Sequence, residues 1–281
     1  MPERPESTTD ETETRSPVAE VLDVTPQMAR DWLARNPSNR SVRRHLVESY
    51  ARDMRAGRWA LNGETVKIAA DGNLLDGQHR LSAVVLADRI IPMVVVREVS
   101  ADHMPTIDTG AKRTYADALK VLGEENTSVL AAVSRRALLW HRGHRTRWGS
   151  LHATALELNE FIAEHPQIRN SADVATKLAS KALLPASTFG LAHWLLSAID
   201  PDDAMWFLAR VADGDALPTN HPVAALRDRI VRMRVGGGRI NETDAIALLI
   251  LAWNAYRAGG TRTKLQLPKG GLTNENFPMP R

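Results

Sequence analysis

Apolar residues along this chain follow two patterns, one before about residue 110 and one after it. The first part mixes helical periods with short β-branched runs, so it predicts both helices and strands. Its leading helices are expected from Thr25 to about Arg35, where Thr25-Pro26 supplies an N-cap and a first-turn proline, and from Ser41 to about Gly57. The predicted strands cover residues 65–70, 73–75 and 91–97. A predicted helix over residues 81–88 precedes the last of these strands. With Asp71-Gly72 as a hairpin turn, this order predicts a small α/β domain with a mixed sheet.

From Arg113 onward the apolar positions follow helical periods almost throughout. The last helix is expected to begin at Asn241, with Asp244 completing a variant of the capping box, and to end at Gly259-Gly260. Its stretch Ala245–Trp253 is apolar on every side, which predicts burial at the centre of this part. The predicted helices cover residues 113–122, 127–143, 153–165, 187–199, 201–212, 221–234 and 241–258.

The two ends of the chain lack these patterns. Residues 1–20 are rich in Glu, Thr, Ser and Pro, which predicts a disordered acidic tail. Residues 261–281 contain several Pro, Gly and Asn and are expected to form a loose tail. The predicted fold class is therefore α+β, with a small α/β domain and its leading helices over 21–120 and a mainly helical domain over 121–260.

The charge of the chain is unevenly distributed. Residues 1–20 hold six acidic residues and two arginines, so the remainder has 34 basic and 27 acidic residues, a net charge of +7. A basic body with an acidic tail suggests a polyanionic partner, and ordinary solubility is the alternative explanation.

Composition also excludes some classes of protein. The chain has no cysteine, which excludes disulfide and thiol chemistry and favours a reducing cytoplasm. The longest apolar run, Ala245–Trp253, is much shorter than the about 20 residues that a membrane helix needs. We therefore expect a cytoplasmic protein with no membrane contact.

The hexapeptide Asp-Gly-Gln-His-Arg-Leu at residues 76–81 is the first candidate site, because it lies where a short strand leads into a helix. Gly77 lets the backbone approach a ligand closely, and the start of the helix offers free amides and a positive dipole end to an anion. Arg80 adds a planar fork of donors suited to phosphate, and His79 can exchange a proton near neutral pH. The alternative is a plain turn in which Asp76 caps the helix.

A second candidate segment, residues 107–114, reads Ile-Asp-Thr-Gly-Ala-Lys-Arg-Thr. Here a glycine turn and two basic residues precede a helix, which again favours anion binding. Asp108 is suited to holding a metal ion or orienting a base. The candidate anion contacts are Thr109, Gly110, Lys112 and Arg113. A capped helix with a solvated basic start is the alternative.

A third candidate is the basic stretch at residues 135–148, which combines five arginines with two histidines and two tryptophans. Such a stretch can neutralise backbone phosphates and stack on unpaired bases. The candidate nucleic-acid contacts are Arg135, Arg136, Arg142, Arg145 and Arg147. The tryptophans are expected in the core.

The residues from Asn62 to Arg97 resemble the ParB/sulfiredoxin superfamily domain. They present Asn-Gly-Glu, a strand, Asp-Gly, then Leu-Leu-Asp-Gly-Gln-His-Arg-Leu, a helix and a strand. The pattern is most similar to phage and plasmid proteins described as ParB-like nuclease domains, and the resemblance covers about residues 40–120. It implies a small mixed-sheet ParB/sulfiredoxin-like domain with a phosphate-binding turn, like the turn that holds a triphosphate in the CTP-binding partition proteins and ADP in a related free serine kinase.

Position by position, the resemblance assigns roles to the residues of the turn. It implies phosphate or nucleotide contacts for Gly77, Gln78, His79 and Arg80, with Gln78 in the place of the sulfiredoxin cysteine. Because the chain has no cysteine, sulfiredoxin chemistry is excluded. Gln78-His79 stands where the partition proteins have Glu-Arg, so the nucleotide, ATP or CTP, stays open.

The resemblance also makes residues 108–113 the second wall of the same pocket. Glu64 lies where some relatives carry a general base or a metal ligand. Together, Glu64, Asp76 and Asp108 are candidate ligands of Mg²⁺ for phosphoryl transfer.

Together with the basic residues, the resemblance implies a phage- or plasmid-type ParB-like DNA-binding protein with a phosphate or nucleotide pocket. If it is a metal-dependent nuclease or nucleotide hydrolase, its candidate catalytic residues are Glu64, Asp76, His79 and Asp108. Two alternatives stay open: a DNA-binding regulator without catalysis, and a small-molecule kinase that uses the same pocket. The expected partners are DNA, a nucleotide with Mg²⁺, and a second copy of the chain.

Overall fold

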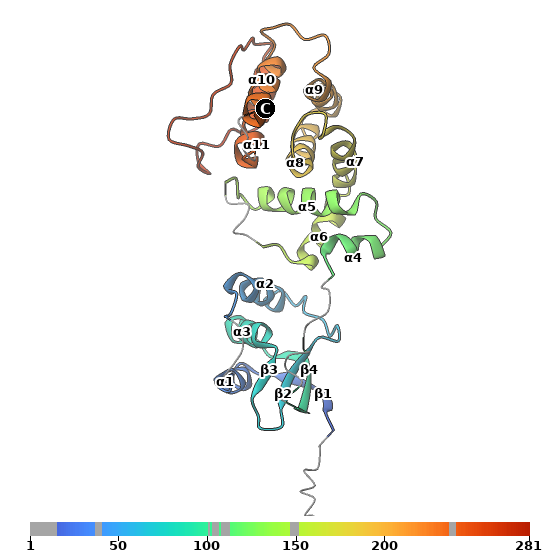
Figure 1. The fold of residues 1–281 in the computed structure, drawn as a ribbon, viewed down its shortest axis with the longest axis vertical. Helices are drawn as coiled ribbons and strands as arrows, with labels where there is room; N and C mark the ends of the chain where they lie inside the picture. The colour runs from blue at the N-terminus through green and yellow to red at the C-terminus, as the bar shows by residue number, and fades with distance from the viewer. Residues whose placement is uncertain are drawn as a thin grey trace, which may run out of the picture. The chain divides into compact units, whose positions relative to one another are not determined.

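The computed structural model describes residues 16–36, 41–100, 102, 107, 113–146, 152–235 and 240–281. Over these residues the protein is mixed α/β, with eleven helices and one four-stranded mixed sheet. The chain divides into two compact units, Met1–Ala111 and Lys112–Arg281 (Figure 1). The sheet lies in the first unit, and the second unit is helical in its described part. The predicted boundary after residue 120 lies inside the second unit.

The sheet of the first unit has the strand order β1-β4-β2-β3. Strand β4 pairs antiparallel with β1 and parallel with β2, and β3 pairs antiparallel with β2. The predicted mixed sheet is therefore confirmed. The strands are β1 (Val18–Val24), β2 (Thr65–Ala69), β3 (Leu74–Asp76) and β4 (Ile91–Val99).

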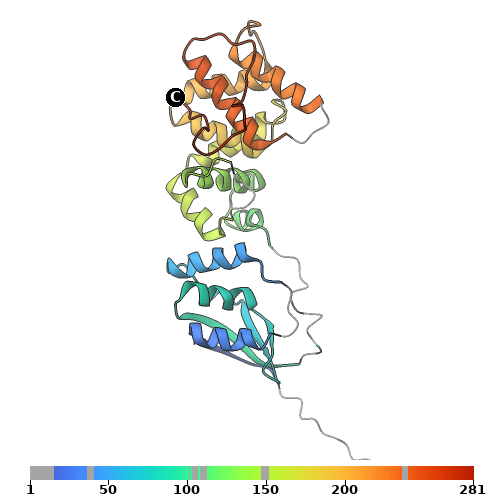
Figure 2. The same cartoon turned by 90° about the vertical axis from the view of Figure 1, so that its left-hand side faces the viewer.

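Three helices pack with this sheet: α1 (Pro26–Ala34), α2 (Arg44–Arg55) and α3 (Gln78–Ala87). Figure 2 shows α3 between α1 and α2, in agreement with the contacts that α3 makes to both. The side chains of Leu81 and Val84 of α3 are fully buried against the sheet residues Val66 and Val95. The start of α3 is thereby fixed against β2, which positions the candidate turn.

Strand β1 corrects the predicted extent of the N-terminal tail. The composition predicts a tail that reaches residue 20, but Val18–Val24 pairs with β4 along seven residues. Glu20 forms an ion pair with Arg97 of β4, with 2.8 Å between Oε1 and Nε. Composition favours disorder here because the hydrogen bonds that order β1 come from a strand about 70 residues further along the chain.

The second unit contains α4 to α11, and all seven of its predicted helices are present. Helix α7 was not predicted. Its buried face includes Ser171, Ala172 and Ala175 beside Ile168 and Val174, so small and polar residues hide its apolar period. The helices are α4 (Tyr115–Val121), α5 (Thr127–His141), α6 (Ala155–Glu164), α7 (Ile168–Leu178), α8 (Ala186–Ser197), α9 (Pro201–Asp213), α10 (Pro222–Val235) and α11 (Glu242–Arg257).

Helices α8 and α11 supply much of the core of this unit. The side chain of Asn241 caps α11 by accepting hydrogen bonds from the backbone amides of Thr243 and Asp244, as the sequence predicts. Residues 245–250 and Trp253 are buried, which confirms the predicted central position of the helix. In the described part of the chain no helix has the length and apolar character needed to cross a membrane.

The C-terminal segment 261–281 corrects another prediction. It has no helix or strand, yet it is not loose, because Leu265 and Phe277 are buried in the core of the second unit. The indole Nε1 of Trp253 donates a hydrogen bond to the carbonyl of Arg281 at 2.8 Å. The segment therefore covers α11, although its composition resembles that of a tail.

Candidate functional site

The candidate turn joins β3 to α3 through Gly77. This residue has φ 104° and is itself the N-cap of α3, with no side chain capping the helix. A Cβ atom at this position would lie 3.0 Å from Cγ2 of Val66 in β2. Glycine is therefore required twice, by the left-handed backbone and by the close packing on β2.

Asp76 is not the N-cap that the alternative interpretation expects. It is the last residue of β3, and its Oδ1 accepts a hydrogen bond from the amide of Gly77 at 2.6 Å. Its Oδ2 lies 2.9 Å from Nζ of Lys67 and 3.3 Å from the guanidinium of Arg80. The carboxylate of Asp76 is thus shared between two cations.

Arg80 is the centre of a small network at this turn. Its guanidinium lies 2.5 Å from Oε2 of Glu64 and donates to the carbonyl of Thr65 at 2.7 Å, in addition to its contact with Asp76. The side chain of Arg80 is 13% exposed, whereas that of Glu64 is 64% exposed. Its buried Nε has no hydrogen-bond partner among the described residues. The carboxylates of Glu64 and Asp76, both predicted site residues, therefore both contact Arg80. The Glu64 side chain is the more exposed of the two.

Gln78 and His79 point inward. Both are buried, and Oε1 of Gln78 accepts a hydrogen bond from the side-chain amide of Asn36 at 3.2 Å. Nε2 of His79 accepts a hydrogen bond from the backbone amide of Arg43 at 3.0 Å, an arrangement that requires the proton of a neutral ring to be on Nδ1. These two side chains attach the chain on either side of residues 37–40 to the start of α3.

The second predicted wall cannot be compared with this turn. Asp108, Thr109, Gly110 and Lys112 lie outside the described residues, and Arg113 is exposed in the second unit. Among the residues that the structure does describe, no three His, Asp or Glu side chains form a group that could hold a metal ion. Of the predicted Mg²⁺ ligands, Glu64 and Asp76 both contact the guanidinium of Arg80.

The arginine-rich stretch makes internal contacts in the second unit. Arg136 forms an ion pair with Glu242, and Arg142 lies 2.9 Å from the buried carboxylate of Glu157. The guanidinium of Arg145 lies 4.1 Å from the ring centroid of Trp140, which is in the core as predicted. Burial lowers the pKa of both Arg136 and Arg145.

The structure describes one of the other two candidate arginines of this stretch. Arg135 is half-buried, and Arg147 lies outside the described residues. The described arginines of this stretch therefore make contacts within the fold and do not form a continuous basic patch.

Helix α10 presents exposed cations that lie outside the three candidate segments predicted from the sequence. Arg229 and Arg232 are exposed, whereas Leu226 and Ile230 of the same helix are buried. Arg232 pairs with Asp228 at 3.0 Å, and both side chains are more than half exposed. The signal in the sequence is the run of four arginines in the eight residues 227–234.

The charge of the body lies mostly in the second unit, where residues 112–281 hold 22 basic and 16 acidic residues. The turn at residues 76–80 and the exposed arginines of α10 are the two features from which a function can be argued. No family model matches the chain, and neither curated proteins nor solved structures give a match. The resemblance to the ParB/sulfiredoxin superfamily accordingly stays a prediction from the residues themselves.

Proposed function

We propose that the chain is a ParB-like DNA-binding protein in which the turn at residues 76–80 binds a phosphate group, either of a nucleotide or of the nucleic-acid backbone. In this proposal Arg80 and the amides at the start of α3 contact the phosphate. Gln78 and His79 position the turn from inside, so they act as positioning residues.

The ion pair between the largely buried Arg80 and the exposed Glu64 is the observation that carries this proposal. A carboxylate that is 64% exposed gains little from such a pair, about 0–1 kcal/mol, so a phosphate can replace it at small cost. The guanidinium fork of Arg80 matches two oxygens of a phosphate as well as it matches a carboxylate. The helix start beside it has no side-chain cap and offers its dipole to the same anion.

The geometry favours binding over cleavage. Both described candidate carboxylates, Glu64 and Asp76, are paired with Arg80, and Nε2 of the buried His79 already accepts a hydrogen bond. A general base needs access to the proton that it removes. Glu64 and Asp76 alone do not make a Mg²⁺ site, so we derive no step through a metal ion. We therefore place the non-catalytic regulator ahead of the nuclease, the hydrolase and the small-molecule kinase.

The exposed arginines of α10 support DNA contact by the second unit. Cations that neutralise phosphates release counterions, so affinity falls steeply with salt. Arg229 and Arg232 are placed for this role because neither faces the core. Replacing both by Ala should weaken binding of duplex DNA and reduce its salt dependence by about two counterions. Replacing the exposed Lys177 and Lys181 of the same unit by Ala is the control with equal loss of charge; equal effects of the two double variants would remove α10 from the proposal.

Titration with nucleotides tests the turn itself. Full-length protein is titrated with CTP, ATP and inorganic phosphate by calorimetry, without Mg²⁺ and then with it. Glu64→Gln removes the competing carboxylate and should tighten binding about three- to tenfold, whereas Arg80→Gln should weaken it at least about tenfold. Glu48→Gln is the control, because Glu48 is likewise an exposed carboxylate paired with an arginine, Arg44, in the same unit. Unchanged affinity in both Arg80→Gln and Glu64→Gln would refute the proposal.

A further inference from the structure

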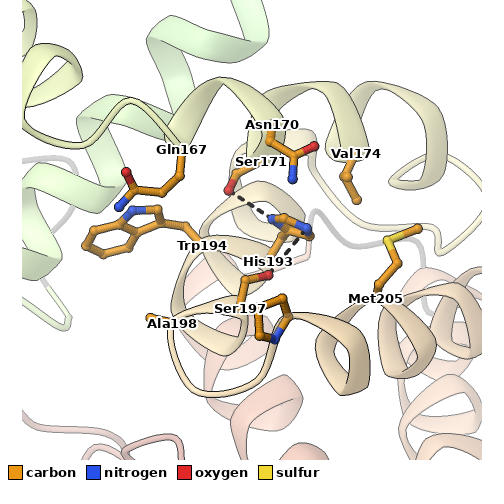
Figure 3. A pocket seen from close by; sticks show the side chains of 10 residues that line it. Gln167, Asn170, Ser171, Val174, His193, Trp194, Ser197, Ala198 and Met205 are labelled. Carbon is orange, nitrogen blue, oxygen red and sulfur yellow. Dashed lines mark hydrogen bonds between the residues drawn. The ribbon is translucent and has the colours of Figure 1, made fainter.

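A cavity of about 440 Å³ opens in the second unit, and none of the residues that line it belongs to the candidate sites discussed above. Helices α7 and α8 and the start of α9 form its walls, as the close view in Figure 3 shows. A volume of this size lies within the range of small-molecule sites, about 300–1,000 Å³. None of the ten residues that line it is Asp, Glu, Lys or Arg.

The floor of the cavity is polar although it is buried. His193 is 4% exposed and lies between two hydroxyl groups, with Ser171 Oγ 2.9 Å from Nδ1 and Ser197 Oγ 3.4 Å from Nε2 (Figure 3). Each hydroxyl can donate as well as accept a hydrogen bond, so this group can serve either kind of partner. A cavity floor that served only packing would not need the three linked polar side chains of Ser171, His193 and Ser197.

The walls above this floor are apolar and aromatic. The half-buried indole of Trp194 stands on one side of His193, and the thioether of Met205, which is 41% exposed, stands on the other (Figure 3). Thioether and indole groups both make favourable contacts with aromatic rings. Gln167 adds a side-chain amide beside Trp194.

We propose that this cavity is a binding site for a small neutral nitrogen heterocycle of the size of a nucleobase. The ring would lie between Trp194 and Met205, and its donors and acceptors would meet the hydroxyl groups of Ser171 and Ser197, which lie beside the two ring nitrogens of His193. A charged ligand is disfavoured because the lining supplies no counter-charge, and burial keeps His193 neutral by lowering its pKa to about 4. This inference does not depend on the proposed phosphate site.

A titration of the full-length wild-type protein tests the site directly. The probes are adenine, uracil, nicotinamide and indole, and the readouts are calorimetry and the ring ¹⁵N resonances of His193 in histidine-labelled protein. At least one probe should bind saturably with a Kd below about 1 mM and shift the His193 resonances. Binding by none of the four up to about 5 mM would overturn the proposal.

Two alanine-to-phenylalanine variants test the location. Ala198→Phe places a ring at the cavity, whereas Ala163→Phe places the same ring on an exposed position of α6 that does not line it. Ala198→Phe should weaken the probe that binds best at least about tenfold, and Ala163→Phe should leave it unchanged. Equal affinity in both variants, with His193 resonances that do not respond, would place the probe elsewhere.

Adenosine monophosphate tests the requirement for neutrality, since it carries the adenine ring with a doubly charged phosphate. It should shift the His193 resonances at least about tenfold less strongly, at equal concentration, than adenine does. A stronger response to the nucleotide than to the base would contradict a neutral ligand. Because only the His193 signal is used, binding of the nucleotide at Arg80 does not disturb this comparison.

Discussion

The backbone amide of Arg43 donates a hydrogen bond to Nε2 of His79, so a residue preceding α2 is attached to the first turn of α3. The two residues are 36 positions apart in the chain. His79 therefore holds the backbone around the turn, and in our proposal Arg80 makes the phosphate contact.

His79→Ala should destabilise the first unit by about 1–3 kcal/mol, because the amide of Arg43 loses its acceptor and a buried ring is removed. Urea unfolding checks this value. His79→Gln supplies an oxygen of similar reach and should recover part of the loss. If phosphate affinity falls as far in the folded His79→Gln protein as in Arg80→Gln, then His79 contacts the ligand and the positioning role is wrong.

Gly77→Ala should cost more stability than Gly63→Ala. Both glycines have positive φ, but a Cβ atom meets Val66 only at Gly77 and has open space at Gly63. We expect a loss of about 1 kcal/mol for Gly63→Ala and about 2–4 kcal/mol for Gly77→Ala. Chemical unfolding of the two variants side by side measures the difference, and equal losses would show that close packing on β2 adds nothing.

The stability of the second unit should depend on pH through His193. Burial lowers its pKa to about 4 in the folded protein, whereas an unfolded histidine titrates near 6.5. The unfolded chain therefore takes up a proton first as pH falls, so this contribution is complete above pH 6.5 and is lost progressively towards pH 4. The free energy of unfolding should fall by an amount on the order of 3 kcal/mol over this window.

His193→Gln is the control for this pH dependence, because it keeps a polar side chain but cannot titrate. The difference between wild type and variant, measured by urea unfolding at several pH values, isolates His193 from the carboxylates. A difference that stays constant between pH 7 and pH 4 would show that His193 is not held neutral by the fold.

Phe277→Ala should destabilise the second unit by about 3–5 kcal/mol, because this ring is buried against Trp140 with 5.6 Å between centroids. Met279→Ala, two residues further on, removes a side chain that is 48% exposed and should change stability by less than about 1 kcal/mol. Thermal unfolding compares the two variants. Equal, small effects would restore the interpretation of residues 261–281 as a loose tail.

Local signals predicted much of the fold. The cap at Thr25, the hairpin at Asp71-Gly72 and the apolar helix after Asn241 are all present, because each depends on residues that are neighbours in sequence. Strand β1 and helix α7 were missed because their order comes from pairing and packing with distant segments. The same distinction explains the burial of Phe277.

The candidate site was predicted less completely than the fold. The sequence places Asp76, Gly77 and Arg80 at a strand-to-helix turn, and the structure has them there. The sequence does not reveal in which direction side chains point. It therefore could not distinguish the inward-pointing Gln78 and His79 from Arg80, the candidate phosphate contact. The ion-pair partners of Arg136 and Arg142 are Glu242 and Glu157. No local sequence motif connects these glutamates to the two arginines.

A crystal structure of the full chain with CTP or inorganic phosphate tests the central claim most directly, because it locates the anion. The account predicts phosphate oxygens within hydrogen-bonding distance of the Arg80 guanidinium and of amides at the start of α3, with the carboxylate of Glu64 turned away. A phosphate bound elsewhere, with Arg80 still paired to Glu64 and Asp76, would contradict it.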